Sequence, residues 1–344
     1  MGQELGRQFS AEIRKSNDSL IADAEASKGI KRDAVMAKVR TYQVYMDKYA
    51  ENLVEELRGI ADGANILYEE ALLMQLRFEI VGYQGVQNDG CTSFAISGER
   101  TANGRVLTGQ NADINDYLEK TLRIIHFSPD DGPDILMPTY YSAMIGWIGI
   151  NSDGLGCFGN AVVCPGWREG FPRYPLLRKI LEKSSVKDAI KFTNEVQRAS
   201  SINVVITDAT GDMKDVETSI NRNSVLEPTH GVLAHANHYL DPELQKTDLL
   251  LPTTCDSPLR YGQMFNRLLS ISSDRESVTV DGCEEILRDH TNWPHSICRH
   301  IDENPRYIGK RIKTIMSIVA SPEERFFEAS WGNPCENSFH RYSI

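Results

Sequence analysis

Apolar residues recur at helical spacing through the first quarter of the chain, with charged residues on the opposite face. The repeating positions are Val35, Val39, Tyr42, Met46, Tyr49, Leu53, Leu57 and Ile60. This pattern predicts helices across 3–77 that pack on a core. Gly59 and Gly63 interrupt the pattern, so we expect a break there, followed by a last helix at about 66–76.

After Cys91 the period of the pattern changes to two, which is typical of strands. Strands are predicted at 92–97, 106–111, 122–127, 144–151, 155–161, 203–207 and 214–218, and in a closing hairpin at 313–320 and 325–330. Helices are predicted at 174–182, 186–198, about 258–270 and 283–288. This order of elements predicts an α+β protein. We expect one domain over 1–344, because no repeat and no low-complexity linker occurs.

Composition narrows the function classes. The net charge of -11 and the lack of Lys/Arg runs argue against a nucleic-acid partner, because polyanion binding needs a basic surface. No apolar run reaches 18 residues, and no signal peptide or peroxisomal C-terminal tripeptide is recognisable, so we expect a cytoplasmic protein without a membrane partner. The seven cysteines are scattered without a Cys-x-x-Cys motif, so neither a disulfide framework nor a zinc ribbon is predicted.

The bond between Gly90 and Cys91 is a candidate for self-cleavage. Glycine before the bond permits a twisted backbone and leaves its carbonyl open to attack by the neighbouring thiol. Cleavage would make Cys91 an N-terminal residue that carries a nucleophile and an amine. An α-amino group titrates near ~7.7 to 8.0, so at neutral pH it can accept the thiol proton without a separate histidine.

Four segments in order resemble one known family. The first is Arg77-Phe78-Glu79, before the bond. The second is Asp89-Gly90-Cys91-Thr92 with the downstream Gly109-Gln110-Asn111-Ala112-Asp113. The last two are His235-Ala236-Asn237-His238 and 292–299. Together they resemble the acyl-coenzyme A:6-aminopenicillanic acid acyltransferase family of self-cleaving N-terminal nucleophile (Ntn) hydrolases. The resemblance covers most of the chain.

The resemblance implies a four-layer αββα sandwich, in which two antiparallel sheets face each other and helices cover both outer faces. It also implies an α chain of residues 1–90 and a β chain of residues 91–344, cut from one precursor. The expected activity is hydrolysis or transfer of the acyl group of a small N-acyl amide. No cofactor is expected, although a coenzyme A thioester is open as acyl donor, and a homodimer is open as the assembly.

The resemblance assigns catalytic roles to four residues. Cys91 is the nucleophile, and Asp113 holds its amine in place. Asn237 donates to the oxyanion, and Arg299 stabilises charge in the site or pairs with Asp113. Each also has an ordinary structural explanation: a buried thiol, a strand-end cap, a buried amide and a surface arginine.

Five further residues are expected to shape the site. Arg77 and Glu79 form a buried ion pair or a helix-end contact. Tyr83, Trp147 and Phe158 are candidates for the wall of an acyl pocket, although aromatic residues on strands are more often plain core.

Two other function classes remain as alternatives. One is an uncut, non-enzymatic binding protein of the same fold. The other is a metal hydrolase that uses histidines among His235, His238, His290, His295 and His300. Their spacing is loose and lacks cysteine or carboxylate partners in register, so we predict no metal.

Overall fold

Two antiparallel sheets face each other at the centre of the molecule. The structure is a computed structural model, and it describes residues 1–82, 90–251, 256–271, 278–304 and 311–344. The first sheet contains β1 (Gly90–Ile96), β2 (Leu107–Asn115), β10 (Val232–His235), β11 (Ile312–Ser321), β12 (Phe326–Trp331) and β13 (His340–Ser343). The second contains β3 (Arg123–Phe127), β4 (Ile135–Thr139), β5 (Gly149–Asn151), β6 (Gly156–Asn160), β7 (Asn203–Thr207), β8 (Met213–Thr218) and β9 (Asn223–Leu226).

The strand order differs between the two sheets. Within the described residues the first sheet runs β10-β1-β2-β11-β12-β13, whereas the second is a meander from β3 to β9. β1 and β2 contact β6 of the other sheet, which places the two sheets face to face. Strands near the centre are buried on both faces, which explains why β1 is almost continuously apolar or small.

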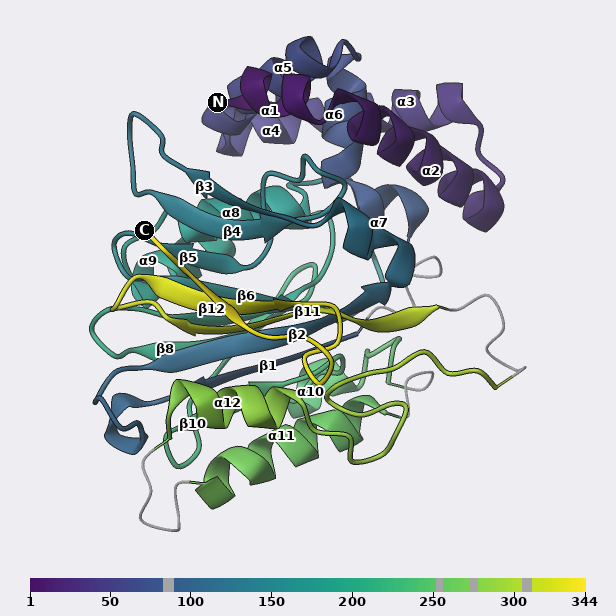
Figure 1. Ribbon diagram of the computed structural model, residues 1–344. Coiled ribbons are helices and arrows are strands. Elements are labelled where there is room, and N and C mark those ends of the chain that lie inside the picture. Colours follow the sequence, from purple (N-terminus) through teal and green to yellow (C-terminus); the bar gives the residue numbers. More distant parts are fainter. Residues whose placement is uncertain (83–89, 252–255, 272–277, 305–310) are drawn as a thin grey trace.

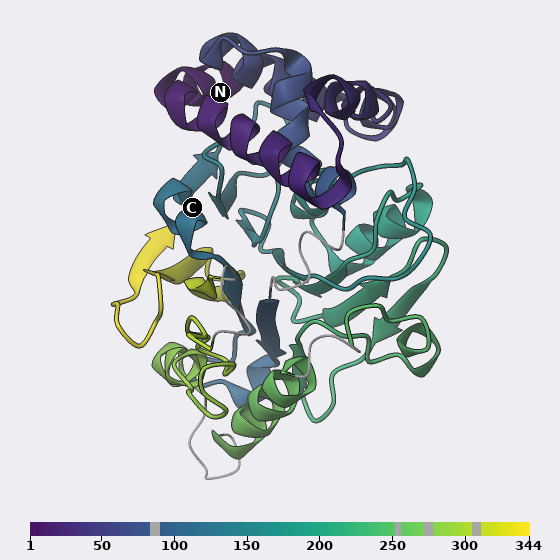
Figure 2. The same ribbon diagram turned by 90° about the vertical axis from the view of Figure 1, so that its right-hand side faces the viewer.

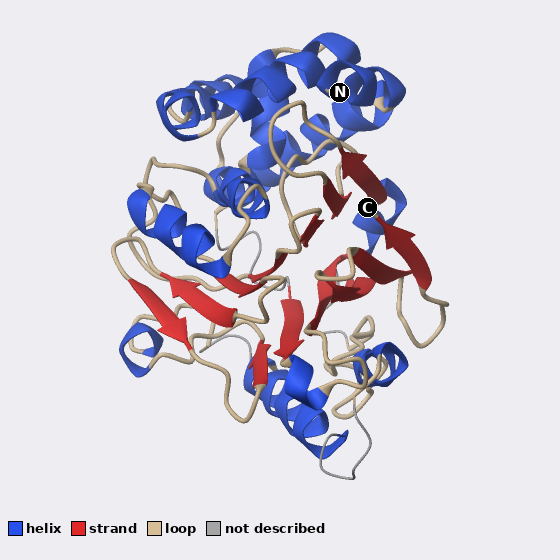
Figure 3. Cartoon of the chain, turned by 90° about the vertical axis from the view of Figure 1, so that its left-hand side faces the viewer, coloured by secondary structure: helices blue, strands red, loops and turns tan. Residues whose placement is uncertain are grey.

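Helices cover the outer face of each sheet. α11 (Ser257–Ile271) and α12 (Val280–Leu287) pack on the first sheet, below β1 and β2 in Figure 1. α8 (Arg173–Leu181) and α9 (Val186–Glu195) pack on the second sheet. Figure 3 shows the strands enclosed by these helices. The structure therefore confirms the α+β class and the four-layer αββα sandwich.

The N-terminal helices form a cap at one end of the sandwich, at the top of Figures 1 and 2. They are α1 (Gly2–Gln8), α2 (Ser10–Lys28), α3 (Arg32–Arg40), α4 (Gln43–Tyr49), α5 (Glu51–Ala64), α6 (Tyr68–Gln75) and α7 (Arg77–Val81). α6 contacts α8, and α7 is the last helix before the predicted cleavage site in the described residues. Within the described parts of the chain, no helix combines the length and apolarity that a membrane span requires.

The predicted break lies just after the two glycines, because α5 continues through Gly59 and Gly63 and ends at Ala64. The last helix predicted at about 66–76 is confirmed as α6. Helix α5 packs against α1, which presents Gly2 and Gly6. A Cβ atom on any of these four glycines would overlap backbone atoms of the facing helix. The glycines therefore allow two helices to approach closely rather than ending one of them.

The strand predicted at 144–151 is also largely wrong, since only β5 remains of it. Tyr141 and Ser142 have positive φ angles of 56° and 61°, which turn the chain out of the sheet. The Ile145 N–H then donates to the side chain of Gln75 rather than to a neighbouring strand. The prediction missed β4, in which Pro138 pairs with Ile124, and it missed the short strands β9, β10 and β13.

Candidate active site

The Gly90–Cys91 bond lies at the first residues of β1, which is hydrogen-bonded between β10 and β2. Gly90 is opposite Asp113 on β2, and Cys91 is opposite Ala112. Both residues of the bond are buried. At this bond β2 pairs with the backbone on one side, whereas β10 pairs with β1 only from Ser93 onward.

Two charged side chains approach Gly90 closely. A Cβ atom on this glycine would lie 3.1 Å from Arg299 Nη1 and 3.1 Å from Asp113 Oδ2. Such distances are shorter than those of nine in ten real Cβ contacts. Both groups therefore fit beside residue 90 because glycine has no side chain. The structure thus brings Asp113 and Arg299 beside the predicted cleavage site, while their catalytic roles stay predictions.

The Asp113 carboxyl is completely buried. Its Oδ1 accepts a hydrogen bond from Thr314 Oγ1 at 2.7 Å, and within the described residues Oδ2 has no hydrogen-bond partner. Burial raises the pKa of Asp113 to about 6, although Arg260 and Arg299 oppose this rise. The carboxyl can therefore exchange a proton close to neutral pH.

Asn237 contacts the nitrogen of Cys91 through its side-chain oxygen. The Cys91 N–H donates to Asn237 Oδ1 at 2.8 Å, and Asn237 Nδ2 donates to the carbonyl of Ala161 at 3.0 Å. The sequence predicted that the amide nitrogen would face the oxyanion. In the structure the oxygen faces the bond instead, and the oxyanion role stays a prediction for the second N–H of Nδ2.

Arg260 on α11 is a site residue that the sequence analysis missed. This buried guanidinium donates to the Cys91 carbonyl at 2.7 Å, to Thr92 Oγ1 at 2.8 Å and to Asn237 Oδ1 at 2.8 Å. Its Nε donates to Asp256 at 3.0 Å. Burial would raise the pKa of Asp256, but Arg260 and Arg299 outweigh burial and hold this pKa at about 2. Arg260 therefore joins the start of β1, Asn237 and Asp256 through its hydrogen bonds.

A sequence signal for Arg260 did exist. Arg260, Met264 and Leu268 are spaced four residues apart and share the buried face of α11. A charged residue on the apolar face of a predicted helix is seldom buried without a partner. The position of Arg260 in the sequence therefore predicts that this side chain meets a buried hydrogen-bond acceptor.

Asn160, at the end of β6, was also missed. Its Oδ1 accepts hydrogen bonds from Ser93 Oγ at 2.5 Å and from Asn203 Nδ2 at 3.4 Å. Its Nδ2 is buried and has no acceptor in the described part of the chain. Asn160 also lines the cavity that Cys91 lines.

The cavity beside Cys91 is small and mostly apolar, with a volume of about 30 Å³. Its wall includes Phe78, Ile114, Tyr140, Trp147, Tyr174, Leu177 and Ile202. Trp147 thus lies at the place expected for an acyl pocket. Phe158 is completely buried in the core, and Tyr83 lies outside the described residues.

Arg77 and Glu79 are both buried in α7 but line different cavities. Glu79 Oε1 accepts from the Arg173 N–H at 3.1 Å and from Ser200 Oγ at 2.7 Å. The Arg173 guanidinium in turn lies 3.9 Å from the ring centre of Phe78, which lines the cavity beside Cys91. Glu79 therefore supports the pocket wall through Arg173, and its pairing with Arg77 stays a prediction.

The histidines on either side of Asn237 make separate hydrogen bonds. His235 Nε2 lies 2.9 Å from Glu217 Oε1, and His238 Nδ1 lies 2.7 Å from Ser257 Oγ. Ser257 Oγ also accepts from the Asn237 N–H at 2.7 Å. These contacts fix the segment that presents Asn237 to Cys91.

Comparison with known proteins identifies the family of the chain. The family model of acyl-coenzyme A:6-aminopenicillanic acid acyl-transferase matches residues 100–336. The acyl-coenzyme A:6-aminopenicillanic-acid-acyltransferase 40 kDa form of Emericella nidulans is 29% identical over 283 residues, which cover 81% of this chain and 75% of that protein.

Solved structures of conjugated bile acid hydrolase from Clostridium perfringens share the fold. One variant of that hydrolase aligns with a TM-score of 0.54 at 16% identity, over 74% of this chain and 97% of that one. A second, mutant form aligns with a TM-score of 0.52 at the same identity and coverage. With the Ntn-hydrolase fold and a family match over more than half of its length, the chain belongs to the acyl-coenzyme A:6-aminopenicillanic acid acyl-transferase family, and this membership supports an acyltransferase or amidase activity.

Proposed function

We propose that this protein cuts its own Gly90–Cys91 bond and then uses Cys91 as an N-terminal nucleophile on small N-acyl amides or thioesters. One observation carries the proposal. The Cys91 nitrogen is held by Asn237 Oδ1 at 2.8 Å, while Asp113 and Arg299 lie against Gly90 on the other side of the same bond. Polar groups are thus in place on both sides of the bond to be cut.

Self-cleavage begins with attack of the Cys91 thiolate on the Gly90 carbonyl carbon. The peptide C–N bond breaks, the nitrogen takes up a proton, and Gly90 is left as a thioester on Cys91 Sγ. Water then hydrolyses the thioester and releases the Gly90 carboxylate and the thiol. Asp113, whose pKa is about 6, can carry the protons of these steps near neutral pH.

In turnover the new amine of Cys91 takes the proton of its own thiol. Asn237 Oδ1 accepts a hydrogen bond from the amine and so orients it toward the sulfur. The thiolate attacks the substrate carbonyl, and the Asn160 Nδ2 donor stabilises the oxyanion together with the second N–H of Asn237. The leaving amine departs with the proton, and water or an acceptor amine then takes the acyl group from Cys91.

The cavity beside Cys91 favours small or flat apolar acyl groups. Its aromatic wall gives apolar contact, and its volume of about 30 Å³ is small. The names of the relatives include acyl-coenzyme A, 6-aminopenicillanic acid and conjugated bile acids, so an N-acyl amide or an acyl thioester is the substrate class we propose. No cofactor enters the proposed reaction, and a homodimer stays open as the assembly.

Acylation of the enzyme tests this proposal. The purified protein is incubated with a short arylacyl p-nitroanilide and quenched in acid, and its intact mass is measured. We expect the mass of the acyl group on the 91–344 chain, and we expect Asn160→Ala to lower kcat by about 10² to 10³-fold because an oxyanion donor is lost. Asn103→Ala, at an exposed turn, is the matched control.

Two results would count against the proposal, namely equal turnover by Cys91→Ala and acylation of another residue. Turnover that Cys91→Ala retains but that a chelator abolishes would favour the histidine-dependent metal hydrolase, and binding without turnover would favour the non-enzymatic binding protein. Adding an acceptor amine then separates the two activities, since a transferase yields the new amide and a hydrolase yields the acid.

A further inference from the structure

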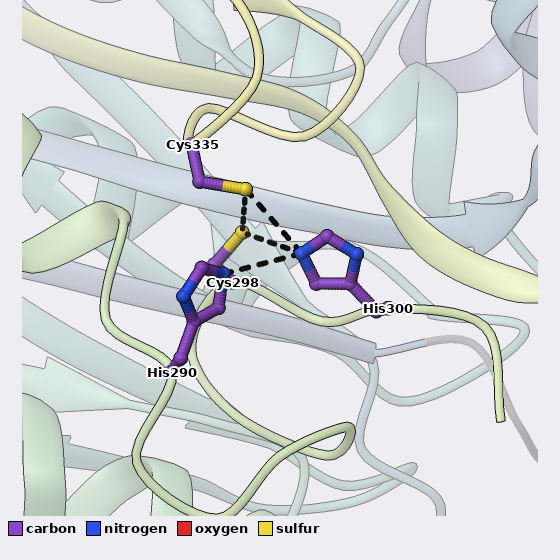
Figure 4. A group of neighbouring side chains, drawn as sticks. All are labelled: His290, Cys298, His300 and Cys335. Atoms are coloured by element: carbon purple, nitrogen blue, oxygen red, sulfur yellow. Dashed lines mark hydrogen bonds between the residues drawn. The ribbon is translucent and has the colours of Figure 1, made fainter.

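Two cysteines and two histidines converge in one cluster, three of them from residues 290–300 and the fourth from a later turn. They are His290, Cys298, His300 and Cys335, and Figure 4 shows their side chains pointing toward one another. One ligand-type atom from each lies within 4.8 Å of the others. His300 Nε2 is central, at 3.2 Å from His290 Nε2, 3.6 Å from Cys298 Sγ and 3.3 Å from Cys335 Sγ.

These separations match the edges of a tetrahedral zinc site. With Zn–S near 2.3 Å and Zn–N near 2.0 to 2.1 Å, tetrahedral geometry places ligand atoms about 3.3 to 3.8 Å apart. The two sulfur atoms lie 3.5 Å apart, close to the S–S edge of such a site. They are too far apart for a disulfide, whose S–S bond is about 2.05 Å.

We propose that His290, Cys298, His300 and Cys335 bind a structural zinc ion. Two thiolates and two imidazoles are a ligand set that zinc prefers, and two thiolate charges balance one divalent ion. Because the protein supplies all four ligands, no position is left for water or substrate. The site is therefore closed and separate from the chemistry at Cys91.

The ion would tie together two segments. His290, Cys298 and His300 lie in the connection between α12 and β11, and Cys335 lies in the turn after β12. Asn333 supports this arrangement, since its Nδ2 donates to the Arg299 carbonyl at 2.8 Å and lies 3.5 Å from Cys298 Sγ. An amide N–H toward a ligand sulfur is a typical outer-shell contact of a metal site.

Arg299 connects this cluster to the candidate active site. It lies between two of the ligands in sequence, and its N–H donates to Thr314 Oγ1 at 2.9 Å. The same threonine hydroxyl donates to Asp113 at 2.7 Å. Zinc would thus fix the backbone that presents the Arg299 guanidinium to Gly90, and would act as a positioning element for the site.

Metal content of the full-length protein tests the site. The protein is purified without chelators, and its metals are quantified by inductively coupled plasma mass spectrometry. We expect one zinc ion per molecule, and a loss of most of it in Cys298→Ser and Cys335→Ser. Cys283→Ser and His340→Ala are controls, because Cys283 is a buried thiol outside the cluster and His340 is exposed on β13.

Cobalt loading keeps the test valid if a variant fails to fold. Cobalt in the wild-type protein should give the thiolate charge-transfer and intense visible bands of a tetrahedral thiolate site. Zinc that persists in the double cysteine variant would overturn the proposal. So would a metal-free wild type whose mass is lower by two hydrogen atoms, because the two cysteines would then form a disulfide.

Two further measurements separate this inference from the proposed function, on which it does not depend. Metal content is also measured in Cys91→Ala, since zinc should bind whether or not the chain is cut. The centres of the Trp293 and His300 rings lie 4.1 Å apart, so removal of zinc should change tryptophan fluorescence, and Trp293→Phe should abolish most of that change. An unchanged signal on complete removal of bound zinc would place the ion elsewhere.

Discussion

The side-chain oxygen of Asn237 accepts a hydrogen bond from the backbone nitrogen of Cys91 at 2.8 Å, across 146 positions of sequence. In the uncut chain this nitrogen belongs to a peptide bond, and after the proposed cleavage it is an amine. The same contact can serve in both states, because an amine and an amide N–H both donate. Arg260 donates to the same oxygen at 2.8 Å and fixes its orientation.

Gly90→Ala should slow self-cleavage. The added methyl group would lie 3.1 Å from both Arg299 Nη1 and Asp113 Oδ2, so at least one of these groups must move. Overpacking of this kind costs about 1 to 3 kcal/mol, which corresponds to about 5 to 150-fold in rate if it acts on the reacting geometry. A time course by gel electrophoresis measures the rate. Gly262→Ala is the control, because a Cβ there meets nothing within 4 Å, and equal rates in both variants would refute this role of Gly90.

Arg260→Met should destabilise the protein strongly. The substitution removes the donor to the Cys91 carbonyl and to Asn237, and it leaves the buried Asp256 without its Arg260 hydrogen bond. Removal of one partner from a buried ion pair typically costs about 3 to 5 kcal/mol. Urea unfolding in the uncut Cys91→Ala background measures this cost. Arg7→Met removes an exposed ion pair and should change the free energy of unfolding by about 0.5 kcal/mol or less. Similar losses in both variants would contradict the role of Arg260.

Asp113→Asn should show a pH-dependent gain in relative stability. The folded-state pKa of Asp113 is raised to about 6, so between its unfolded value and about 6 the native state binds more protons, and stability falls as pH rises. Asparagine lacks this ionisation. The free energy of unfolding of the variant, relative to that of the wild type, should therefore rise by about 2 kcal/mol between pH ~4.5 and ~7.5.

Unfolding midpoints in the uncut background measure this shift. Asp134→Asn is the control of opposite sign, because hydrogen bonds from Ser128 and His126 lower the pKa of Asp134. Its carboxylate contributes stability above the unfolded pKa that is lost as pH falls. A constant difference between Asp113→Asn and its parent across this pH range would show that Asp113 does not carry a raised pKa.

Trp147→Phe should raise the activity on longer acyl groups relative to the activity on shorter ones. Trp147 lines the small cavity beside Cys91, and a smaller ring leaves space for an additional methylene group. Such differences in apolar pockets change kcat/KM ratios by about 10-fold or more. The measurement compares a longer and a shorter acyl amide in both proteins. Trp331→Phe on β12 is the control, and an unchanged ratio in Trp147→Phe would exclude this cavity as the acyl site.

Asp113 was predictable from a short local pattern. It lies in β2, the hairpin partner of β1, and antiparallel pairing alone brings it opposite Gly90. Asn237 and Arg299 came from segments that resemble the family, not from spacing. Their contacts with Cys91 and Gly90 needed the structure.

Arg260 and Asn160 were not predictable with the same ease. Their importance depends on what each side chain meets across the sandwich, and an arginine or an asparagine in a helix or strand is ordinary by itself. The cluster of His290, Cys298, His300 and Cys335 was missed because three of its ligands lie in one segment without a metal-binding spacing motif, and the fourth, Cys335, lies 35 positions beyond His300. The packing role of Gly59 and Gly63 was missed because it depends on the facing helix α1.

The intact mass of the purified wild-type protein beside Cys91→Ala tests self-cleavage most directly. We expect two chains in the wild type, residues 1–90 and 91–344, and a single chain in Cys91→Ala. Circular dichroism of both proteins confirms that each is folded. A folded wild-type protein that stays whole, or a Cys91→Ala variant that is cut at the same bond, would contradict the claim that Cys91 creates its own N-terminal amine.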